Sequence, residues 1–309
     1  MSKAIIIGGR GKVGSYLAPM LLADGFEVVS VARGLGAPFA AQPGWDDVRQ
    51  VVLDRADPGF PAQIAALGGD VVIDMICFAK ADMNALVAEL AGSVRHYLVC
   101  GSVWMHGPGR QLPVREDEDR NPPDEYGVQK EAMDREIARL WAQTGFPGTA
   151  VHPGHIVCPG DEPINPQGFK GLSAFEALKR GEELPLPNFG LETVHHVAAQ
   201  DVAGVFRAAV QIGRPSFGEG FHAVSPRATT LRGYAEEVAS WFGREPKLSF
   251  APFHEWATRV SPGDAAMTLE HISRSPSCST HKTESVLGYQ SVHTSYQAVK
   301  ECVASFGLL

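Results

Sequence analysis

Residues 4–25 of this 309-residue chain read AIIIGGRGKVGSYLAPMLLADG. The stretch begins with four apolar residues, Ala4–Ile7, which predict a short strand buried on both faces. Three glycines at spacing three predict a tight turn after it. Leu17, Met20 and Leu21 then recur at helical spacing, and Asp24-Gly25 is a typical helix end. A strand, a glycine-rich turn and a helix in this order predict the start of a βαβ unit.

The alternation of strands and helices continues through the first half of the chain. Strands that are apolar throughout and separated by helices are typical of a parallel sheet covered on both faces. We therefore expect an α/β fold with a doubly wound parallel sheet. The predicted strands are 26–32, 51–53, 71–76, 96–100 and 149–152, and the predicted helices are 15–23, 63–67, 82–90 and 130–143.

The sequence pattern changes in the second half of the chain. Prolines at 163, 166, 185 and 187 interrupt the pattern, so a βα rhythm is no longer readable. We expect helices at 201–211, 231–242 and 295–306 and a strand at 221–224. These features predict a Rossmann-type domain over residues 1–160 and a smaller, irregular α+β substrate domain mainly over 161–309, with some later segments returning to the first domain.

Composition excludes several classes of protein. Lys+Arg number 27 against Asp+Glu 35, and the resulting charge of −8 disfavours nucleic acid as a general partner. The longest apolar stretch, residues 71–79, is interrupted by Asp74 and is far shorter than the ~20 residues of a membrane span. The five cysteines are widely spaced and the N-terminus carries no signal-peptide pattern, so we expect a cytoplasmic protein.

The glycine-rich turn is the first candidate site. One glycine permits the tight turn, one allows a pyrophosphate to approach the backbone, and one lets the helix pack against the strand. The phosphates would bind the free N–H groups at the start of the helix. An isolated match would be a simple turn, but its place between a strand and a helix predicts dinucleotide binding. The predicted contacts are Gly8, Arg10, Gly11, Lys12, Val13 and Gly14.

The end of the second strand indicates which dinucleotide is bound. An acidic residue there would bind the adenosine ribose of NAD, but the strand ends Val31-Ala32-Arg33. A guanidinium suits a 2′-phosphate, so Arg33, assisted by Arg10, favours NADP, with NAD as the alternative. Arg33 is otherwise a solvated loop charge. Asp54, after the third strand, is predicted to meet the adenine amino group, unless it only caps a turn.

A second motif is Tyr126-Gly127-Val128-Gln129-Lys130. Four residues along a helix place Tyr126 and Lys130 on one face, where the lysine charge is expected to lower the tyrosine pKa. Tyr296 and Lys300 have the same spacing, so spacing alone does not select the site. Ser102, at the end of the fifth predicted strand, offers a hydroxyl to the first pair, and we interpret Tyr296 as a core residue.

Together these motifs resemble the extended short-chain dehydrogenase/reductases, the NAD(P)-dependent epimerase/dehydratase family. The segments Val151–His155, Asp201–Ala203 and Leu287–Tyr289 agree with it, so the resemblance spans nearly the whole chain. It implies that Tyr126 acts as general acid/base and that Lys130 lowers its pKa and binds the nicotinamide ribose. It also implies that Ser102 holds the reacting oxygen, that Pro153 and His155 line the nicotinamide side, and that the protein forms a homodimer.

Two departures from the family bear on the substrate. The family often has Tyr-Gly shortly after the serine, whereas this chain has Trp104-Met105-His106-Gly107. We predict substrate contacts from Trp104 and His106, although His106 is equally well an ordinary loop residue. Members that act on nucleotide sugars commonly use an arginine in the segment before Asp201, but no Arg or Lys lies between Arg180 and Arg207.

The sequence therefore predicts an NAD(P)-dependent oxidoreductase that transfers hydride between nicotinamide and a carbonyl or secondary alcohol of a small substrate. The alternative is a sugar or nucleotide-sugar epimerase or dehydratase with retained cofactor. A third class is a binding protein without catalysis, since some proteins similar to this family interact with RNA. His152 and His155 lie three apart without a carboxylate cluster, so no metal site is predicted.

Overall fold

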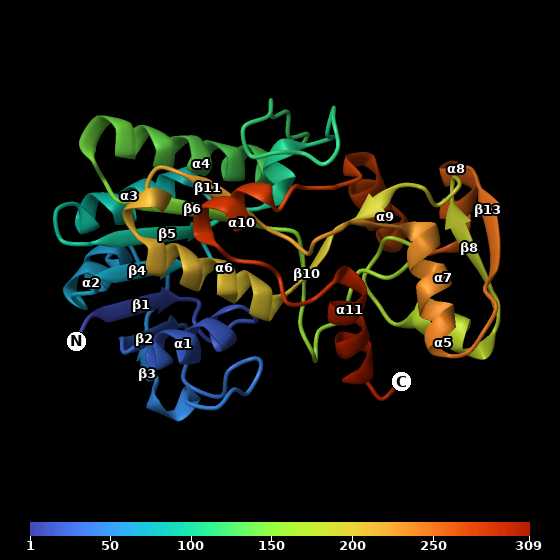
Figure 1. Ribbon diagram of the computed structural model, residues 1–309, viewed down its shortest axis with the longest axis horizontal. Helices are drawn as coiled ribbons and strands as arrows, with labels where there is room; N and C mark the ends of the chain where they lie inside the picture. The colour runs from blue at the N-terminus through green and yellow to red at the C-terminus, as the bar shows by residue number, and fades with distance from the viewer.

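The computed structural model describes residues 1–309. Its larger part is a seven-stranded sheet in the order β11-β6-β5-β4-β1-β2-β3, with all neighbours parallel (Figure 1). The strand order reverses beside β1, which makes the fold a doubly wound, Rossmann-like α/β fold as predicted. The strands are β1 (Lys3–Ile7), β2 (Glu27–Ala32), β3 (Arg49–Val52), β4 (Val71–Asp74), β5 (His96–Cys100), β6 (Gly148–Pro153) and β11 (Gly220–Ala223).

Helices cover both faces of this sheet. Successive residues of β1 illustrate why: Ile6 belongs to the apolar core on one face, and Ile5 and Ile7 belong to the core on the other. The first face packs against α1 (Gly14–Ala23), α6 (Ala199–Ile212) and α10 (His281–Leu287). The second face packs against α2 (Phe60–Ala66), α3 (Lys80–Leu90) and α4 (Glu125–Thr144).

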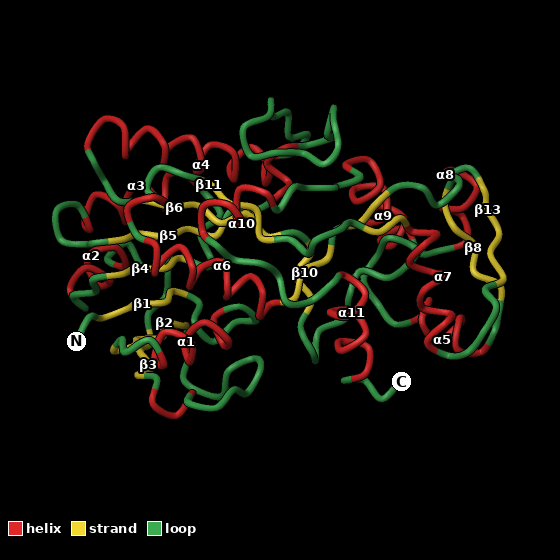
Figure 2. Tube along the Cα trace, in the orientation of Figure 1, coloured by secondary structure: helices red, strands yellow, loops and turns green.

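A smaller part, at the right of Figure 1, has its own apolar core. Much of it consists of loops between short elements (Figure 2). Three two-stranded ladders join β7 (His155–Val157) to β10 (His196–Ala198), β9 (Thr193–Val194) to β12 (Thr229–Thr230), and β8 (Glu183–Pro187) to β13 (Lys247–Ala251). The helices are α5 (Ser173–Arg180), α7 (Leu231–Trp241), α8 (Phe253–Trp256), α9 (Pro262–Arg274) and α11 (Ser295–Ala304).

Helix α4, which corresponds to the predicted helix 130–143, starts earlier than expected. It begins at Glu125 rather than Lys130 because Asp124 caps it, its carboxylate accepting a hydrogen bond from Gly127 N at 2.7 Å. Three elements beyond residue 160, α6, β11 and α10, belong to the layers of the large sheet. The exact limits of the two domains stay a prediction.

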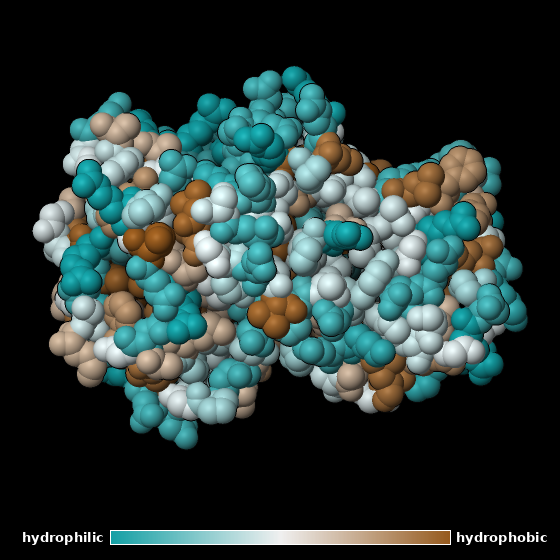
Figure 3. All heavy atoms as spheres, viewed as in Figure 1, coloured by the Kyte–Doolittle hydropathy of each residue, from teal (hydrophilic) through white to brown (hydrophobic).

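No helix of the chain combines the length and the apolar character that a membrane crossing requires. The surface in Figure 3 is largely hydrophilic, with hydrophobic residues in small separate groups on the face shown.

Candidate active site

The glycine-rich loop between β1 and α1 is held tightly against its surroundings. Gly8 has φ +83°, a backbone conformation that favours glycine. A Cβ on Gly9 would lie 2.5 Å from Ser30 Oγ, and one on Gly14 would lie 2.4 Å from Gly9 O. The loop therefore packs closely against β2 and the start of α1. A side chain at position 9 or 14 would displace the loop.

The start of α1 offers backbone donors. The amide of Ser15 donates to Gly11 O at 2.9 Å, but the amides of Lys12, Val13 and Gly14 donate to no backbone carbonyl. No side chain caps this helix end. Free N–H groups at a helix N-terminus favour anions, so the loop has the donor set that a pyrophosphate requires.

Arg10 fastens the segment after β2 to the glycine loop. Its guanidinium donates to Gly34 O at 2.5 Å and to Ala37 O at 3.2 Å, and its own carbonyl accepts from Phe39 N at 2.9 Å. The predicted role of Arg10 beside a 2′-phosphate would compete with these contacts.

Lys12, the next basic residue of the loop, forms an ion pair with Asp161, whose other oxygen accepts from Lys170 Nζ at 2.8 Å. Its charge is therefore balanced by a carboxylate from beyond β7.

Arg33 and Asp54 lie at the edge of one open cleft. The cleft has a volume of about 750 Å³ and runs from the ends of β1 and β2 to Phe78. Arg33 is exposed, which leaves its guanidinium free for a ligand. Asp54 accepts from Ala56 N at 3.0 Å, so it also has the turn role left open by the sequence.

Lys130 is buried on the sheet side of α4. It is 2% exposed, and Nζ donates to Cys77 O and to Cys100 O, each at 2.7 Å. These carbonyls follow β4 and lie at the end of β5, so the ammonium group stands at the carboxyl edge of the sheet. Burial lowers the pKa of Lys130.

Tyr126 stands beside this ammonium group, with its ring centre 5.5 Å from Lys130 Nζ. The predicted decrease in the Tyr126 pKa is wrong for this structure: the pKa is raised to about 12, mainly because burial disfavours the phenolate, although the Ser102 hydroxyl opposes the rise. The residue is 39% exposed, so part of the side chain is open to solvent.

Ser102 and Trp104 also lie next to Tyr126. Ser102 precedes a short 3₁₀ helix, η2 (Val103–His106), and its Oγ accepts from Trp104 N at 3.2 Å. The Trp104 ring lies 6.0 Å from the Tyr126 ring in an edge-to-face arrangement. His106 is directed elsewhere, into a buried contact with His222, which favours the loop-residue interpretation over a substrate contact.

Pro153 ends β6 and His155 begins β7, next to Trp104. The His155 ring lies 6.4 Å from Trp104 and 4.7 Å from His271, and neither of its ring nitrogens has a hydrogen-bond partner. Burial lowers the pKa of His155 well below its usual value, so the ring is neutral.

Sequence reasoning missed two residues of this region. Arg274, at the end of α9, forms an ion pair with Asp124, the cap of α4, and its guanidinium lies 3.9 Å from the centre of the Trp104 ring. His271 precedes it by one helical turn. The role of Asp124 could have been predicted, because an Asp just before a helix commonly caps it. Nothing in the local sequence indicates that Arg274 reaches it.

The second Tyr-x-x-x-Lys pair has no such surroundings. Tyr296 packs 6.4 Å from Tyr234 in the smaller part, and Lys300 Nζ lies 5.6 Å from the Trp241 ring.

Residues 4–217 match the family model of the NAD dependent epimerase/dehydratase family. The chain belongs to this family. The glycine loop, Arg33, Ser102, Tyr126 and Lys130 all lie within the matched residues, whereas His271 and Arg274 lie outside them.

Two curated relatives are of different kinds. The chain is 33% identical over 141 residues to 2′-dehydrokanamycin reductase of Streptomyces kanamyceticus, a match that covers 45% of this chain and 39% of the reductase. It is 26% identical over 258 residues to the chloroplast stem-loop binding protein of 41 kDa b of Arabidopsis thaliana, covering 80% of this chain and 65% of that protein. The chain thus matches less than two thirds of either relative's length.

The fold is also similar to solved structures. A UDP-glucose 4-epimerase of Thermotoga maritima, solved with UDP-glucose, superposes with a TM-score of 0.73 at 17% identity, covering 99% of this chain and 98% of the epimerase. At that identity the likeness shows the Rossmann-like fold, which agrees with the sheet order described above.

Proposed function

We propose that this protein is an NADP(H)-dependent oxidoreductase that interconverts a carbonyl and a secondary alcohol on a small substrate without a nucleotide. The observation that carries the proposal is the position of Lys130. A buried ammonium group at the carboxyl edge of the sheet stands next to a phenol that burial keeps protonated, in the region where open α/β sheets bind ligands.

The residues present fit a dinucleotide. The free amides of Lys12 and Val13 would hold its pyrophosphate, and the cleft beyond β2 would take its adenosine end, with Asp54 at the adenine. Arg33 would bind a 2′-phosphate, and no acidic residue stands at the end of β2 to select against that group. When bound, the cofactor supplies or accepts a hydride.

Tyr126 would move the proton. Because its pKa is raised to about 12, the phenol is protonated at neutral pH and is ready to donate to a carbonyl oxygen as it becomes an alcohol. Lys130, held by Cys77 O and Cys100 O, presents a positive charge that stabilises the phenolate left behind. Its third donor remains available for a ribose hydroxyl.

Ser102 would hold the reacting oxygen next to Tyr126. Its Oγ accepts from Trp104 N, which leaves the hydroxyl proton free to donate to a substrate oxygen. Pro153, at the end of β6, and His155, at the start of β7, would line the nicotinamide side, and Trp104 would contact the substrate.

The substrate class follows from charge. Arg274, a guanidinium near Tyr126 that the sequence did not predict, is paired with Asp124 and stacked on Trp104, so its charge is already balanced. The segment before α6 carries no basic residue for a diphosphate. These features favour a substrate without phosphate groups, in line with the reductase among the relatives.

A second candidate is an epimerase or dehydratase that retains its cofactor. It is favoured by Arg10, whose hydrogen bonds hold residues 34–39 against the glycine loop. A dinucleotide bound at this loop would be released slowly. A binding role without catalysis, suggested by the stem-loop binding relative, is disfavoured by the intact Ser102, Tyr126 and Lys130.

The deciding experiment is a reaction of the purified protein with NADPH and a panel of small carbonyl compounds. Steady consumption of NADPH supports the oxidoreductase. Turnover without net change in cofactor, together with nucleotide found bound after purification, supports the epimerase or dehydratase.

A further inference from the structure

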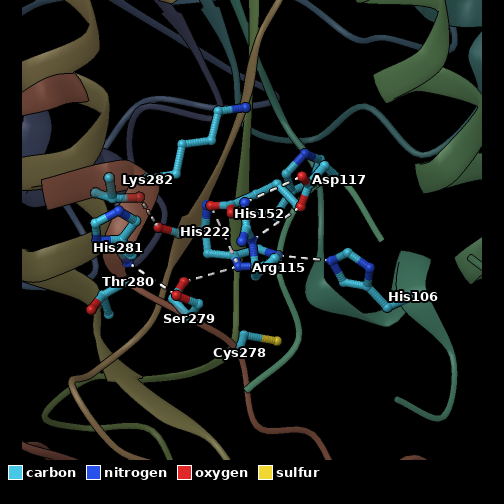
Figure 4. A network of polar contacts seen from close by, with 12 residues as sticks. His106, Arg115, Asp117, His152, His222, Cys278, Ser279, Thr280, His281 and Lys282 are labelled. Carbon is cyan, nitrogen blue, oxygen red and sulfur yellow. Dashed lines mark hydrogen bonds and ion pairs between the residues drawn. The ribbon is translucent and has the colours of Figure 1, made fainter. Parts of the chain in front are cut away.

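Two buried histidines meet behind the candidate site. His106, at the end of η2, and His222, in β11, have Nε2 atoms 2.8 Å apart and are 3% and 1% exposed (Figure 4). Two ring nitrogens at this distance form a hydrogen bond only if one carries a proton and the other does not.

The surroundings fix which ring is the donor. His222 Nδ1 lies 3.0 Å from the carbonyl oxygen of Ser279, which can only accept. His222 therefore carries its proton on Nδ1, and its Nε2 accepts. It follows that His106 donates from Nε2, which leaves its Nδ1 without a proton, in agreement with the lack of any partner for that atom.

His222 is a rigid acceptor because three segments hold it. Its amide donates to Glu116 Oε1 at 3.0 Å, its carbonyl accepts from Thr283 Oγ1 at 2.6 Å, and its ring donates to Ser279. The network around this position is drawn in Figure 4.

His106 is connected to Ser102 by a single short turn. Within η2, Met105 N donates to Ser102 O and Gly107 N donates to Trp104 O, each at 3.2 Å. One turn of 3₁₀ helix does not fix its own orientation, so the packing of its buried Val103 and Met105 and the contacts at its ends decide where it lies. One end carries the Ser102 hydroxyl, and the other carries the His106 ring bound to His222.

We propose that His106 is a positioning residue, which orients η2 through its hydrogen bond to His222 and thereby places the Ser102 hydroxyl beside Tyr126. This inference rests on the proposed role of Ser102. It gives His106 a function that needs no contact with the substrate.

A double-mutant cycle tests the connection. His106→Leu removes the donor and should lower kcat by about 10- to 100-fold, the cost of a misplaced catalytic group, while the Kd for NADPH stays unchanged. In a Ser102→Ala background the same substitution should cause no further loss, because His106 acts through Ser102. The substrate is the carbonyl compound that gives the fastest NADPH oxidation.

Two further variants separate positioning from general damage. His106→Gln keeps an N–H donor and should recover most of the kcat lost in His106→Leu. His96→Gln is the matched control: His96 is also buried in the sheet, with Nε2 2.8 Å from Thr149 Oγ1, but it lies at the start of β5, away from Ser102. It should keep the wild-type kcat.

Nitrogen NMR of histidine-labelled protein gives a readout that needs no substrate and no Leu variant. It should find the His106 proton on Nε2 and the His222 proton on Nδ1. The opposite assignment on either ring overturns the proposal. So does a His106→Leu effect that adds fully to that of Ser102→Ala, or no effect at all. A wild-type kcat in Ser102→Ala would instead contradict the proposed role of Ser102 itself.

Discussion

Lys130 and Tyr126 stand on one face of α4, with the ammonium nitrogen 5.5 Å from the centre of the phenol ring. The lysine is fixed there by the carbonyls of Cys77 and Cys100, at the edge where β4 and β5 end. A cation is thus held ready beside a phenol that burial keeps protonated. This arrangement suits an acid that must give up its proton during a reaction and be stabilised afterwards.

Tyr126→Phe removes the proposed acid and leaves the packing of the ring intact. We expect kcat to fall by at least about 10²-fold, the usual contribution of general acid–base catalysis, with the Kd for NADPH unchanged. Steady-state kinetics and fluorescence titration of NADPH measure the two effects. Tyr296→Phe, in the second Tyr-x-x-x-Lys pair, is the matched control and should behave as the wild type.

Lys130→Met should destabilise the protein even without cofactor. The substitution leaves Cys77 O and Cys100 O buried without their donor, at a cost of about 2 kcal/mol or more in the free energy of unfolding. Urea unfolding measures this loss. Lys300→Met, on the exposed side of α11, should change the free energy by less than about 0.5 kcal/mol. Equal effects of the two substitutions would contradict the structural role of Lys130.

Arg33→Ala should abolish the preference for NADPH over NADH. The exposed guanidinium is free to bind a 2′-phosphate, and its loss should raise the Kd for NADPH about tenfold while the Kd for NADH stays nearly constant. Arg10→Ala is the comparison, because Arg10 holds the loop at Gly34 and Ala37 and should affect both dinucleotides alike. An unchanged preference in Arg33→Ala would refute the assignment.

Stability should decline as the pH falls from about 6.5 to about 4. Burial lowers the pKa of several histidines to between about 2 and about 4, whereas in the unfolded chain their pKa is about 6.5. In this window the unfolded state binds protons that the folded state does not, so each such histidine costs up to about 1.4 kcal/mol per pH unit. They are His96, His106, His195, His196 and His222.

Urea unfolding at a series of pH values measures this dependence. His96→Gln should reduce the slope of the free energy of unfolding against pH by the contribution of one histidine, up to about 1.4 kcal/mol per pH unit. A free energy of unfolding that stays constant between pH about 6.5 and about 4 would contradict the prediction.

Much of the sheet could be predicted because its signals are local. The run Ala4–Ile7 and the glycines after it placed β1 and the start of α1 to within a residue, and the predicted fifth strand coincides with β5. The same local patterns selected Ser102, Tyr126 and Lys130, which the fold brings to one edge of the sheet.

The parts that were missed depend on distant partners. β8 pairs with β13, about 60 residues away, and prolines at both 185 and 187 hide it from any pattern of strand propensity. The rise in the Tyr126 pKa results from burial by surrounding elements. The sequence around the motif does not indicate which elements pack on Tyr126. The contact of Arg274 with Asp124 joins residues 150 positions apart.

The most direct test of Tyr126 as the catalytic acid compares three proteins in one assay: wild type, Tyr126→Phe and Tyr296→Phe, each with NADPH and a reactive carbonyl compound. We expect wild type and Tyr296→Phe to consume NADPH at the same rate, and Tyr126→Phe to bind NADPH equally well but to react at least about 10²-fold more slowly. A Tyr126→Phe protein that consumes NADPH at the wild-type rate would contradict it.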